Sequence, residues 1–208
     1  MPNHTTSRLE ITGDTNEIKR FVSMVDKGED KHFDFGGVVC FPEELRNTSS
    51  PVILRSQEEI DTIWARWEAN TDKKEFEKDR PFNLGITKET SDILNSKYGC
   101  DNWYSWNVTH WGTKWGAYDA GIWEVEDGFA SITYTTAWNP ATEFFINSSE
   151  QFPKLTFKHY FADEGGGFIG WEIVKNGKVV QAFSPEWNSE DGIELQKDLG
   201  VWYEEESE

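Results

Sequence analysis

The chain has 208 residues, with 38 Asp and Glu against 20 Lys and Arg and a net charge of -18. At about 100–200 residues per domain, this length fits one domain, or one domain with an insert. The aromatic content of 15%, with 11 Trp, excludes a disordered acidic chain, and the mean hydropathy of -0.68 comes with no apolar run long enough for a membrane span.

The first expected elements are a strand, a helix and a second strand. Residues His4–Thr12 are rich in Thr and apolar side chains, which is typical of a strand. Asp14 or Thr15 caps a helix that runs to about Lys27, with apolar residues at helical spacing. Residues His32–Phe41 are expected to form the second strand, which a proline ends.

Residues 43–118 differ in character and predict a helical insert. Ser56 is followed by Glu59 at the position of a capping box, which predicts that a helix begins there. Thr87 caps another short helix that ends near Lys97. Both patterns are local, so they predict helices without reference to the rest of the fold.

Strand patterns return in the second half of the chain. Alternating residues predict strands over 129–138 and 155–161, separated by a helix over about 140–151. Asn176-Gly177 is a strong hairpin turn signal between strands over 168–175 and 178–183.

This order of elements predicts an α+β, ferredoxin-like fold. Two β-α-β segments would form one antiparallel sheet in the split β-α-β arrangement, with helices on one face and an added C-terminal hairpin. The expected domain covers residues 1–185, with the insert at about 43–118, and residues 186–208 form an acidic tail with nine acids and a single Lys.

Several stretches of the chain together carry a family resemblance. They are Pro2–Leu9, Ile11–Gly13, Phe33–Phe35, Phe41–Leu45, Asn102–Asn107, Trp111–Trp115, Ala137–Trp138 and Phe161–Phe168. These stretches resemble the YubB-like (Api-like) proteins of phages and conjugative plasmids. The resemblance covers most of residues 2–184, and its most specific part is the Trp-rich run over residues 103–115. It implies a ferredoxin-like domain and a mobile genetic element as the source, and it implies no activity.

Basic residues and cysteines limit the partners that the chain can have. The densest basic pairs, Lys73-Lys74 and Lys19-Arg20, are too sparse for a phosphate-backbone footprint, which disfavours duplex DNA. Cys40 and Cys100 have no metal-ligand spacing. We expect both to be reduced thiols, with Cys40 buried in an apolar strand. The N-terminus lacks a signal-like segment, which predicts a cytoplasmic protein with no membrane association.

No catalytic or metal-binding pattern is visible. None of the four histidines pairs with another His or Cys at ligand spacing, and His159 alternates with Phe157 and Phe161, which favours a core histidine. Acid pairs such as Asp163-Glu164 are common by chance among 38 acids. The sequence therefore predicts no enzyme activity, no metal and no cofactor.

The Trp-rich run and one loop are the candidate binding residues. Four indoles in this run form either a core or a flat platform, since each buries about 150–250 Å² when packed. The glycines at 165–167 favour a hairpin turn, with an adaptable binding loop as the alternative. The candidates are Trp103, Trp106, Asn107, His110, Trp111, Lys114, Trp115, Asp163 and Glu164.

These observations favour a non-enzymatic accessory binding protein of a phage or plasmid. It would inhibit or modulate a host or antiviral-defence protein that carries a basic groove, through an acidic, Trp-rich surface. The alternative is a nucleotide or single-stranded nucleic-acid binder that uses the Trp platform. An edge strand can pair between subunits, so a homodimer is a further expectation.

Overall fold

The computed structural model describes residues 3–28, 32–70, 80–81 and 83–202. The chain forms two compact units, which are described separately. The sheet unit comprises residues 1–40 and 107–208, and the insert unit comprises residues 41–106. The expected insert ended at residue 118, whereas residues 107–118 are part of the sheet unit.

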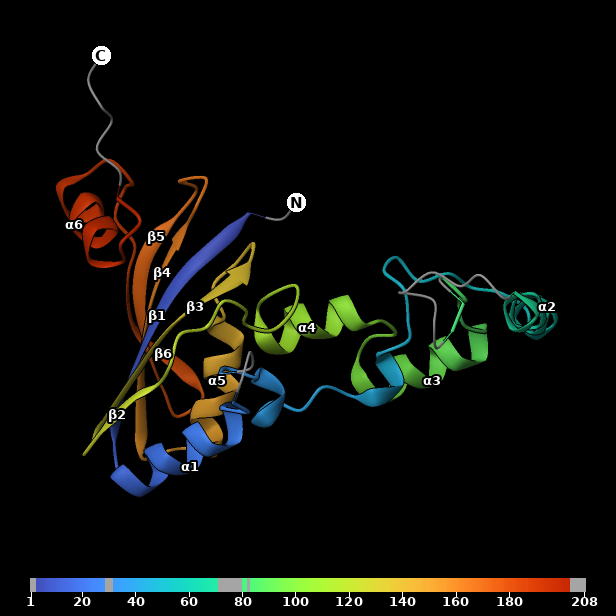
Figure 1. The fold of residues 1–208 in the computed structure, drawn as a ribbon, viewed down its shortest axis with the longest axis horizontal. Coiled ribbons are helices and arrows are strands. Elements are labelled where there is room, and N and C mark those ends of the chain that lie inside the picture. The colour runs from blue at the N-terminus through green and yellow to red at the C-terminus, as the bar shows by residue number, and fades with distance from the viewer. Residues whose placement is uncertain (1–2, 29–31, 71–79, 82, 203–208) are drawn as a thin grey trace, which may run out of the picture. The chain divides into compact units, whose positions relative to one another are not determined.

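The sheet unit is built on six antiparallel strands in the order β2-β3-β1-β4-β5-β6 (Figure 1). The strands are β1 His4–Gly13, β2 Glu124–Glu126, β3 Phe129–Ala137, β4 Leu155–Asp163, β5 Ile169–Lys175 and β6 Lys178–Phe183. Because β1 is antiparallel to both β3 and β4, those two strands run in the same direction with β1 between them. Helix α5 (Thr142–Gln151) connects them, which is the expected split β-α-β arrangement.

Helices cover both faces of this sheet. Helix α1 (Thr15–Val25) and α5 lie on one side and α6 (Glu190–Asp198) lies on the other (Figure 1). On the α1 and α5 side the core is aromatic: the ring of Phe21 meets those of Phe152 and Phe157 edge-on, each at 5.3 Å between ring centres. Apolar residues alternate toward this side along β1, where Leu9 and Ile11 are fully buried.

Helix α6 forms within the segment that was expected to be an acidic tail. Ser189 caps it by accepting the N–H of Gly192. Arg8 on β1 holds it to the sheet, because its Nη2 lies 2.6 Å from Asp198 Oδ2. The hydrogen bond and charge of Arg8 hold the pKa of Asp198 below its ordinary value, despite partial burial. Residues 203–208 of the expected tail lie outside the described residues.

The second strand expected over residues 32–41 is wrong. This stretch contains a loop and the short 3-10 helix η1 (Phe35–Gly37), which the Asp34 side chain caps by accepting the N–H of Gly36 at 2.9 Å. The alternating Phe33 and Phe35 are both buried, but they dock on the sheet from a loop. The backbone of Gly37 approaches α1 so closely that a Cβ would lie 1.8 Å from the Met24 carbonyl oxygen.

Two further expectations fail in the sheet unit. Cys40 is exposed, because it follows this loop and is not part of a buried strand. The strand expected over residues 129–138 ends at Ala137, and Trp138 adopts a left-handed φ of 73°. Its side chain is 37% exposed, whereas that of Tyr134 is buried.

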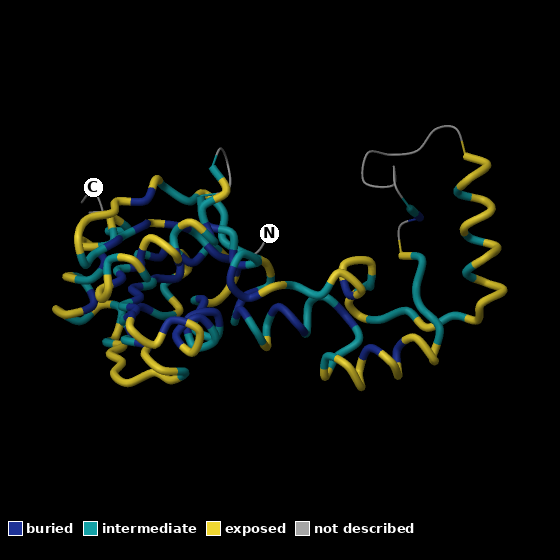
Figure 2. The backbone as a smooth tube through the Cα atoms, turned by 90° about the horizontal axis from the view of Figure 1, so that it is seen from below, coloured by how far each residue is buried: buried dark blue, intermediate teal, exposed yellow. Residues whose placement is uncertain are grey.

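The insert unit consists of short helices and loops. It contains η2 (Glu43–Leu45), α2 (Gln57–Ala69), α3 (Lys88–Tyr98) and the start of α4 (Trp103–Trp111). The expected capping box of Ser56 and Glu59 is present in full. Helix α2 has no buried residue, which Figure 2 shows as a coil of exposed and intermediate positions. No helix among the described residues has the length and apolar character to cross a membrane.

Candidate functional site

A groove of about 790 Å³ lies in the sheet unit, where the ends of β1 and β4 meet α6 and its flanking segments. We call it the Asp163 groove. Two of its residues, Asp163 and Glu164, were predicted from the sequence, and the others come from the C-terminal segment or the start of β1. The residues used below are His4, Asp163, Glu164, Trp187, Gln196 and Trp202.

The acidic wall of the groove is held by strand ends and a glycine turn. Asp163 is 5% exposed, and its Oδ2 accepts the N–H of Gly167 at 3.0 Å. Its Oδ1 accepts a long hydrogen bond of 3.5 Å from the Asn3 side-chain amide. Glu164 is exposed, and its Oε1 accepts the backbone N–H of His4 at 2.9 Å. Each carboxylate therefore keeps acceptor capacity at the groove wall.

Indole rings form the second wall. Gln196 on α6 is buried and donates from Nε2 to the Trp187 carbonyl at 2.7 Å. The Trp187 indole packs over the turn, where a Cβ on Gly166 would lie 3.4 Å from it. Lys197 Nζ lies 5.4 Å from the ring centre of Trp202, within cation–π distance. In this aromatic wall, Trp187 is held against the glycine turn, and the Trp202 ring contacts the ammonium group of Lys197.

The groove is electrostatically negative. Neither Asp163 nor Glu164 forms an ion pair within the described part of the chain. The Tyr118 hydroxyl lies 2.6 Å from Nδ1 of His4 and 3.2 Å from the Thr136 carbonyl oxygen. Burial, followed by nearby carboxylates that include Glu164, raises the pKa of Tyr118 above its ordinary value.

The Trp-rich run divides into buried and exposed residues. Part of the run forms helix α4, and Trp106 and Trp111 on it are 4% and 8% exposed. The indole N–H of Trp111 donates to the Val39 carbonyl at 3.0 Å, and the Trp106 ring meets Phe41 edge-on. These two indoles are packing residues of their respective units, so the four indoles do not form a single open platform.

Asn107 and His110 both take part in local backbone contacts. Asn107 is 5% exposed and donates from Nδ2 to the Lys114 carbonyl at 2.8 Å, which closes the turn after α4. Its Oδ1 is buried without a hydrogen-bond partner among the described residues. The backbone carbonyl of His110 accepts the Asn147 side-chain amide at 2.9 Å.

Lys114 and Trp115 form an exposed cluster together with Trp138. Lys114 Nζ lies 4.8 Å from the ring centre of Trp115 and 4.3 Å from that of Trp138. Both rings are 37% exposed. We call these three residues the Lys114 cluster. Trp103, the remaining predicted candidate, lines a pocket in the insert unit that is described below.

Sequence reasoning missed how the groove is assembled. The acidic pair and the C-terminal tryptophans were each visible in the sequence, but the docking of α6 that brings them together was not. Among the described residues, no group of three or more His, Cys, Asp or Glu is placed to hold a metal ion.

The antiparallel sheet with its split β-α-β connection and packed helices defines a ferredoxin-like domain of the α+β class. Residues 110–205 match the family model described as "Ferredoxin-like domain in Api92-like protein". All groove residues from Asp163 to Trp202 lie within the match, whereas the insert unit lies outside it.

The chain is also similar to two individual proteins. The "Uncharacterized protein YubB" of Escherichia coli (strain K12) is 28% identical over 101 residues, which cover 47% of this chain and 67% of the relative. The crystal structure of the protein api92 from Yersinia pseudotuberculosis is 11% identical, covers 89% of this chain and 98% of its own, and has a TM-score of 0.48.

Proposed function

We propose that this chain is a non-enzymatic binding protein of a phage or plasmid that engages a basic segment of a host or defence protein. The observation that carries the proposal is the Asp163 groove, in which two carboxylates without a cationic partner in the described chain stand beside indole rings. Its resemblance to proteins of mobile genetic elements supplies the biological context, and binding would inhibit or modulate the partner.

The chemistry of the groove favours a Lys or Arg side chain as the occupant. A guanidinium or ammonium group binds to carboxylates through charge-assisted hydrogen bonds. The same cation is attracted to an indole face, as the contact of Lys197 with Trp202 illustrates. The net charge of -18 attracts a basic partner at long range and raises its association rate.

Fluorescence anisotropy of a labelled hexa-arginine peptide tests the proposal on the full chain. We expect saturable binding that weakens steeply with salt, because the interacting charges are partly exposed. Glu164→Gln keeps an acceptor for the His4 N–H but loses its charge, and is expected to weaken binding about tenfold. Trp202→Leu, which removes one of the two indoles of the second wall, is expected to weaken binding similarly.

The matched control is Glu124→Gln on the exposed edge strand β2, which loses the same charge outside the groove. It should leave the affinity within about twofold of the wild type. If Glu124→Gln and Glu164→Gln weaken binding equally, the peptide is responding to overall charge and the groove proposal fails. If only Glu164→Gln weakens binding, co-purification from the natural host followed by native mass spectrometry identifies the partner protein.

A second candidate function is single-stranded nucleic-acid or nucleotide binding, and the Lys114 cluster is the observation that favours it. Bases stack on exposed indoles, and an adjacent Lys can contact the phosphate. Titration with a ten-residue deoxythymidine oligonucleotide, monitored by Trp fluorescence, tests this function. Trp115→Ala should abolish the quenching, whereas Trp64→Ala, which removes a similarly exposed indole from α2, should not. Equal quenching in both variants would exclude the cluster as the site.

A further inference from the structure

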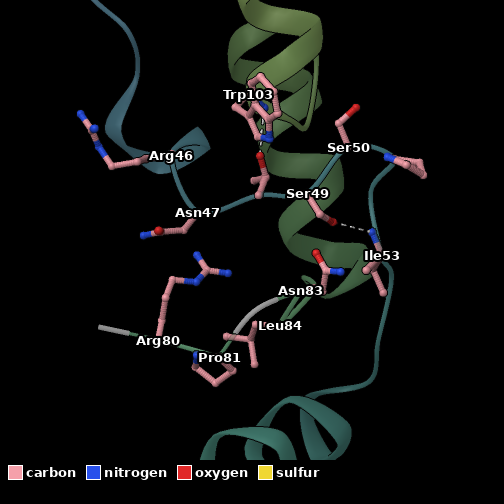
Figure 3. A pocket seen from close by; sticks show the side chains of 13 residues that line it. Arg46, Asn47, Ser49, Ser50, Ile53, Arg80, Pro81, Asn83, Leu84 and Trp103 are labelled. Carbon is pink, nitrogen blue, oxygen red and sulfur yellow. Dashed lines mark hydrogen bonds between the residues drawn. The ribbon is translucent and has the colours of Figure 1, made fainter. Parts of the chain in front are cut away.

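The insert unit contains a separate pocket of about 420 Å³, which the proposed function does not use. Its walls come from residues 46–51 and 53, residues 80–81 and 83–85, and Trp103 at the start of α4 (Figure 3). We call it the Arg80 pocket. It lies outside the segment that matches the family model, so nothing known of the ferredoxin-like domain assigns it a role.

Hydrogen bonds fix the walls of the Arg80 pocket. Arg55 Nη1 donates to the backbone carbonyls of Asn83 and Leu84 at 2.8 and 3.0 Å, which holds these two residues in place. On the opposite side, the Thr48 hydroxyl accepts the backbone N–H of Trp103 at 2.9 Å. Gly85 adopts a φ of +79°, and a Cβ there would lie 2.6 Å from the Ile53 carbonyl oxygen. These hydrogen bonds and the close backbone approach therefore hold the described walls in a defined conformation.

Arg80 differs from the other two arginines around the pocket. Arg46 pairs with Glu43 at 2.7 Å, and Arg55 is satisfied by backbone carbonyls. Arg80 is half-buried, and it forms neither an ion pair nor a hydrogen bond with any residue that the structure describes. Figure 3 shows its guanidinium directed toward Asn47, whereas the Arg46 side chain points away.

A half-buried guanidinium without a partner among the described residues keeps donors that an anionic ligand can use. Burial lowers the pKa of Arg80 below its ordinary value, which is the sign of incomplete solvation, but arginine stays charged. Guanidinium groups bind phosphate through a planar fork of donors. The local electrostatics permit an anion here, because the insert unit has nine Lys and Arg against 13 Asp and Glu, a much smaller excess than the chain as a whole.

The remaining lining indicates what the phosphate is attached to. Asn47, Ser50 and Asn83 supply amide and hydroxyl groups, and Leu84 and the Trp103 indole supply apolar surface. Ligand pockets of about 300–1,000 Å³ commonly combine a mainly apolar lining with a few placed polar groups. A volume of about 420 Å³ is at the lower end of this range and suits a mononucleotide.

We propose that the Arg80 pocket binds a mononucleotide, with its phosphate on the Arg80 guanidinium and its base against the Trp103 indole. This site is independent of the Asp163 groove and does not rest on the proposed function. No chemical step is involved, because the contacts are those of recognition alone.

Isothermal titration calorimetry of the full chain with AMP, GMP, CMP and UMP tests the proposal, with the four matching nucleosides as phosphate-free probes. We expect saturable binding of at least one nucleotide and at least about tenfold weaker binding of its nucleoside, because the nucleoside lacks the charge-assisted contact. Arg80→Gln should weaken nucleotide binding about tenfold and leave nucleoside binding unchanged. Trp103→Leu should weaken both.

The matched control is Arg66→Gln, which removes the same charge from an exposed position on α2 of the same unit. Its affinity should equal that of the wild type, and far-ultraviolet circular dichroism should be the same for all three variants. Binding of no nucleotide at millimolar concentration overturns the proposal. Equal weakening by Arg80→Gln and Arg66→Gln also overturns it, because the anion would then be responding to net charge.

Discussion

His159 on β4 and Glu172 on β5 lie directly opposite each other in the sheet, with Nδ1 of the histidine 3.2 Å from Oε1 of the carboxylate. Both side chains are buried, at 0% and 6% exposed. On its other side, the His159 ring has its Nε2 2.9 Å from the Tyr134 hydroxyl on β3. A polar chain thus crosses the sheet inside the aromatic core.

This placement predicts how stability depends on pH. Burial lowers the pKa of His159 below its ordinary value of 6.5, although the Glu172 hydrogen bond partly opposes the shift. The folded state therefore holds the neutral ring, while the unfolded chain takes up a proton below about pH 6.5, so the free energy of unfolding falls as the pH drops below that value. Urea unfolding at pH 7.5, 6.5 and 5.5 measures this, with His159→Gln as the reference that cannot titrate. A stability difference between the two proteins that stays constant over this range would contradict the prediction.

Loss of the Tyr134 hydroxyl should destabilise the fold. Tyr134→Phe leaves a buried ring nitrogen of His159 without its partner, which costs about 1–3 kcal/mol. Tyr160→Phe is the control, because the Tyr160 hydroxyl makes a long 3.4 Å contact with the partly exposed Glu10. Chemical denaturation compares the two variants. An effect of Tyr134→Phe no larger than that of Tyr160→Phe would mean that the polar chain contributes nothing measurable.

Truncating a side chain in the docked loop at residues 33–37 should destabilise the fold far more than truncating one on an edge strand. The ring of Phe35 stacks on that of Phe144 at 4.1 Å and is 1% exposed. Phe35→Ala is expected to cost about 3–5 kcal/mol through lost burial and a cavity. Phe183→Ala on β6, where the ring is 39% exposed, should cost about 1 kcal/mol or less. Thermal unfolding of both variants checks the ranking, and similar losses would argue against the docked loop.

Asp198→Asn should loosen α6 with little effect on the rest of the fold. The variant keeps the shape of the side chain but loses the charge that pairs with Arg8, and a partly exposed pair of this kind contributes about 1 kcal/mol or less. Because α6 positions Gln196 and the flanking tryptophans, hydrogen exchange should accelerate in α6 and binding of the basic peptide should weaken. Glu194→Gln on the same helix is the control. Unchanged exchange in the Asp198 variant would show that apolar packing alone holds α6.

Local sequence signals predicted much of this fold. The capping box at Ser56 and Glu59 and the turn at Asn176-Gly177 each specify their structure within a few residues, and both are present. The buried position of His159 also follows from simple alternation along β4. The strand expected over residues 32–41 is wrong for a physical reason: a loop can bury Phe33 and Phe35 against a sheet as a strand would.

The candidate sites were less predictable because they depend on contacts between distant segments. Asp163 meets Trp187 only after α6 has docked on the sheet through Arg8. Arg80 stands out only because Arg46 and Arg55 have hydrogen-bond partners, whereas Arg80 has none among the described residues. Neither relationship has a signature in residue spacing, since each depends on which partner a side chain finds in three dimensions.

The net negative charge of the chain also affects whether the exposed edge strand β6 can pair with a second copy. All six of its residues are exposed, including Val179 and Val180, and the strand forms one edge of the sheet. Such an edge can add a strand from a second copy of the chain. Mutual repulsion at a net charge of -18 opposes this encounter, and it weakens as the Debye length shrinks from about 10 Å at 0.1 M salt to about 3 Å at 1 M. The excess of negative charge thereby protects the protein from aggregation. Self-association through β6 should therefore first become visible at high salt concentration.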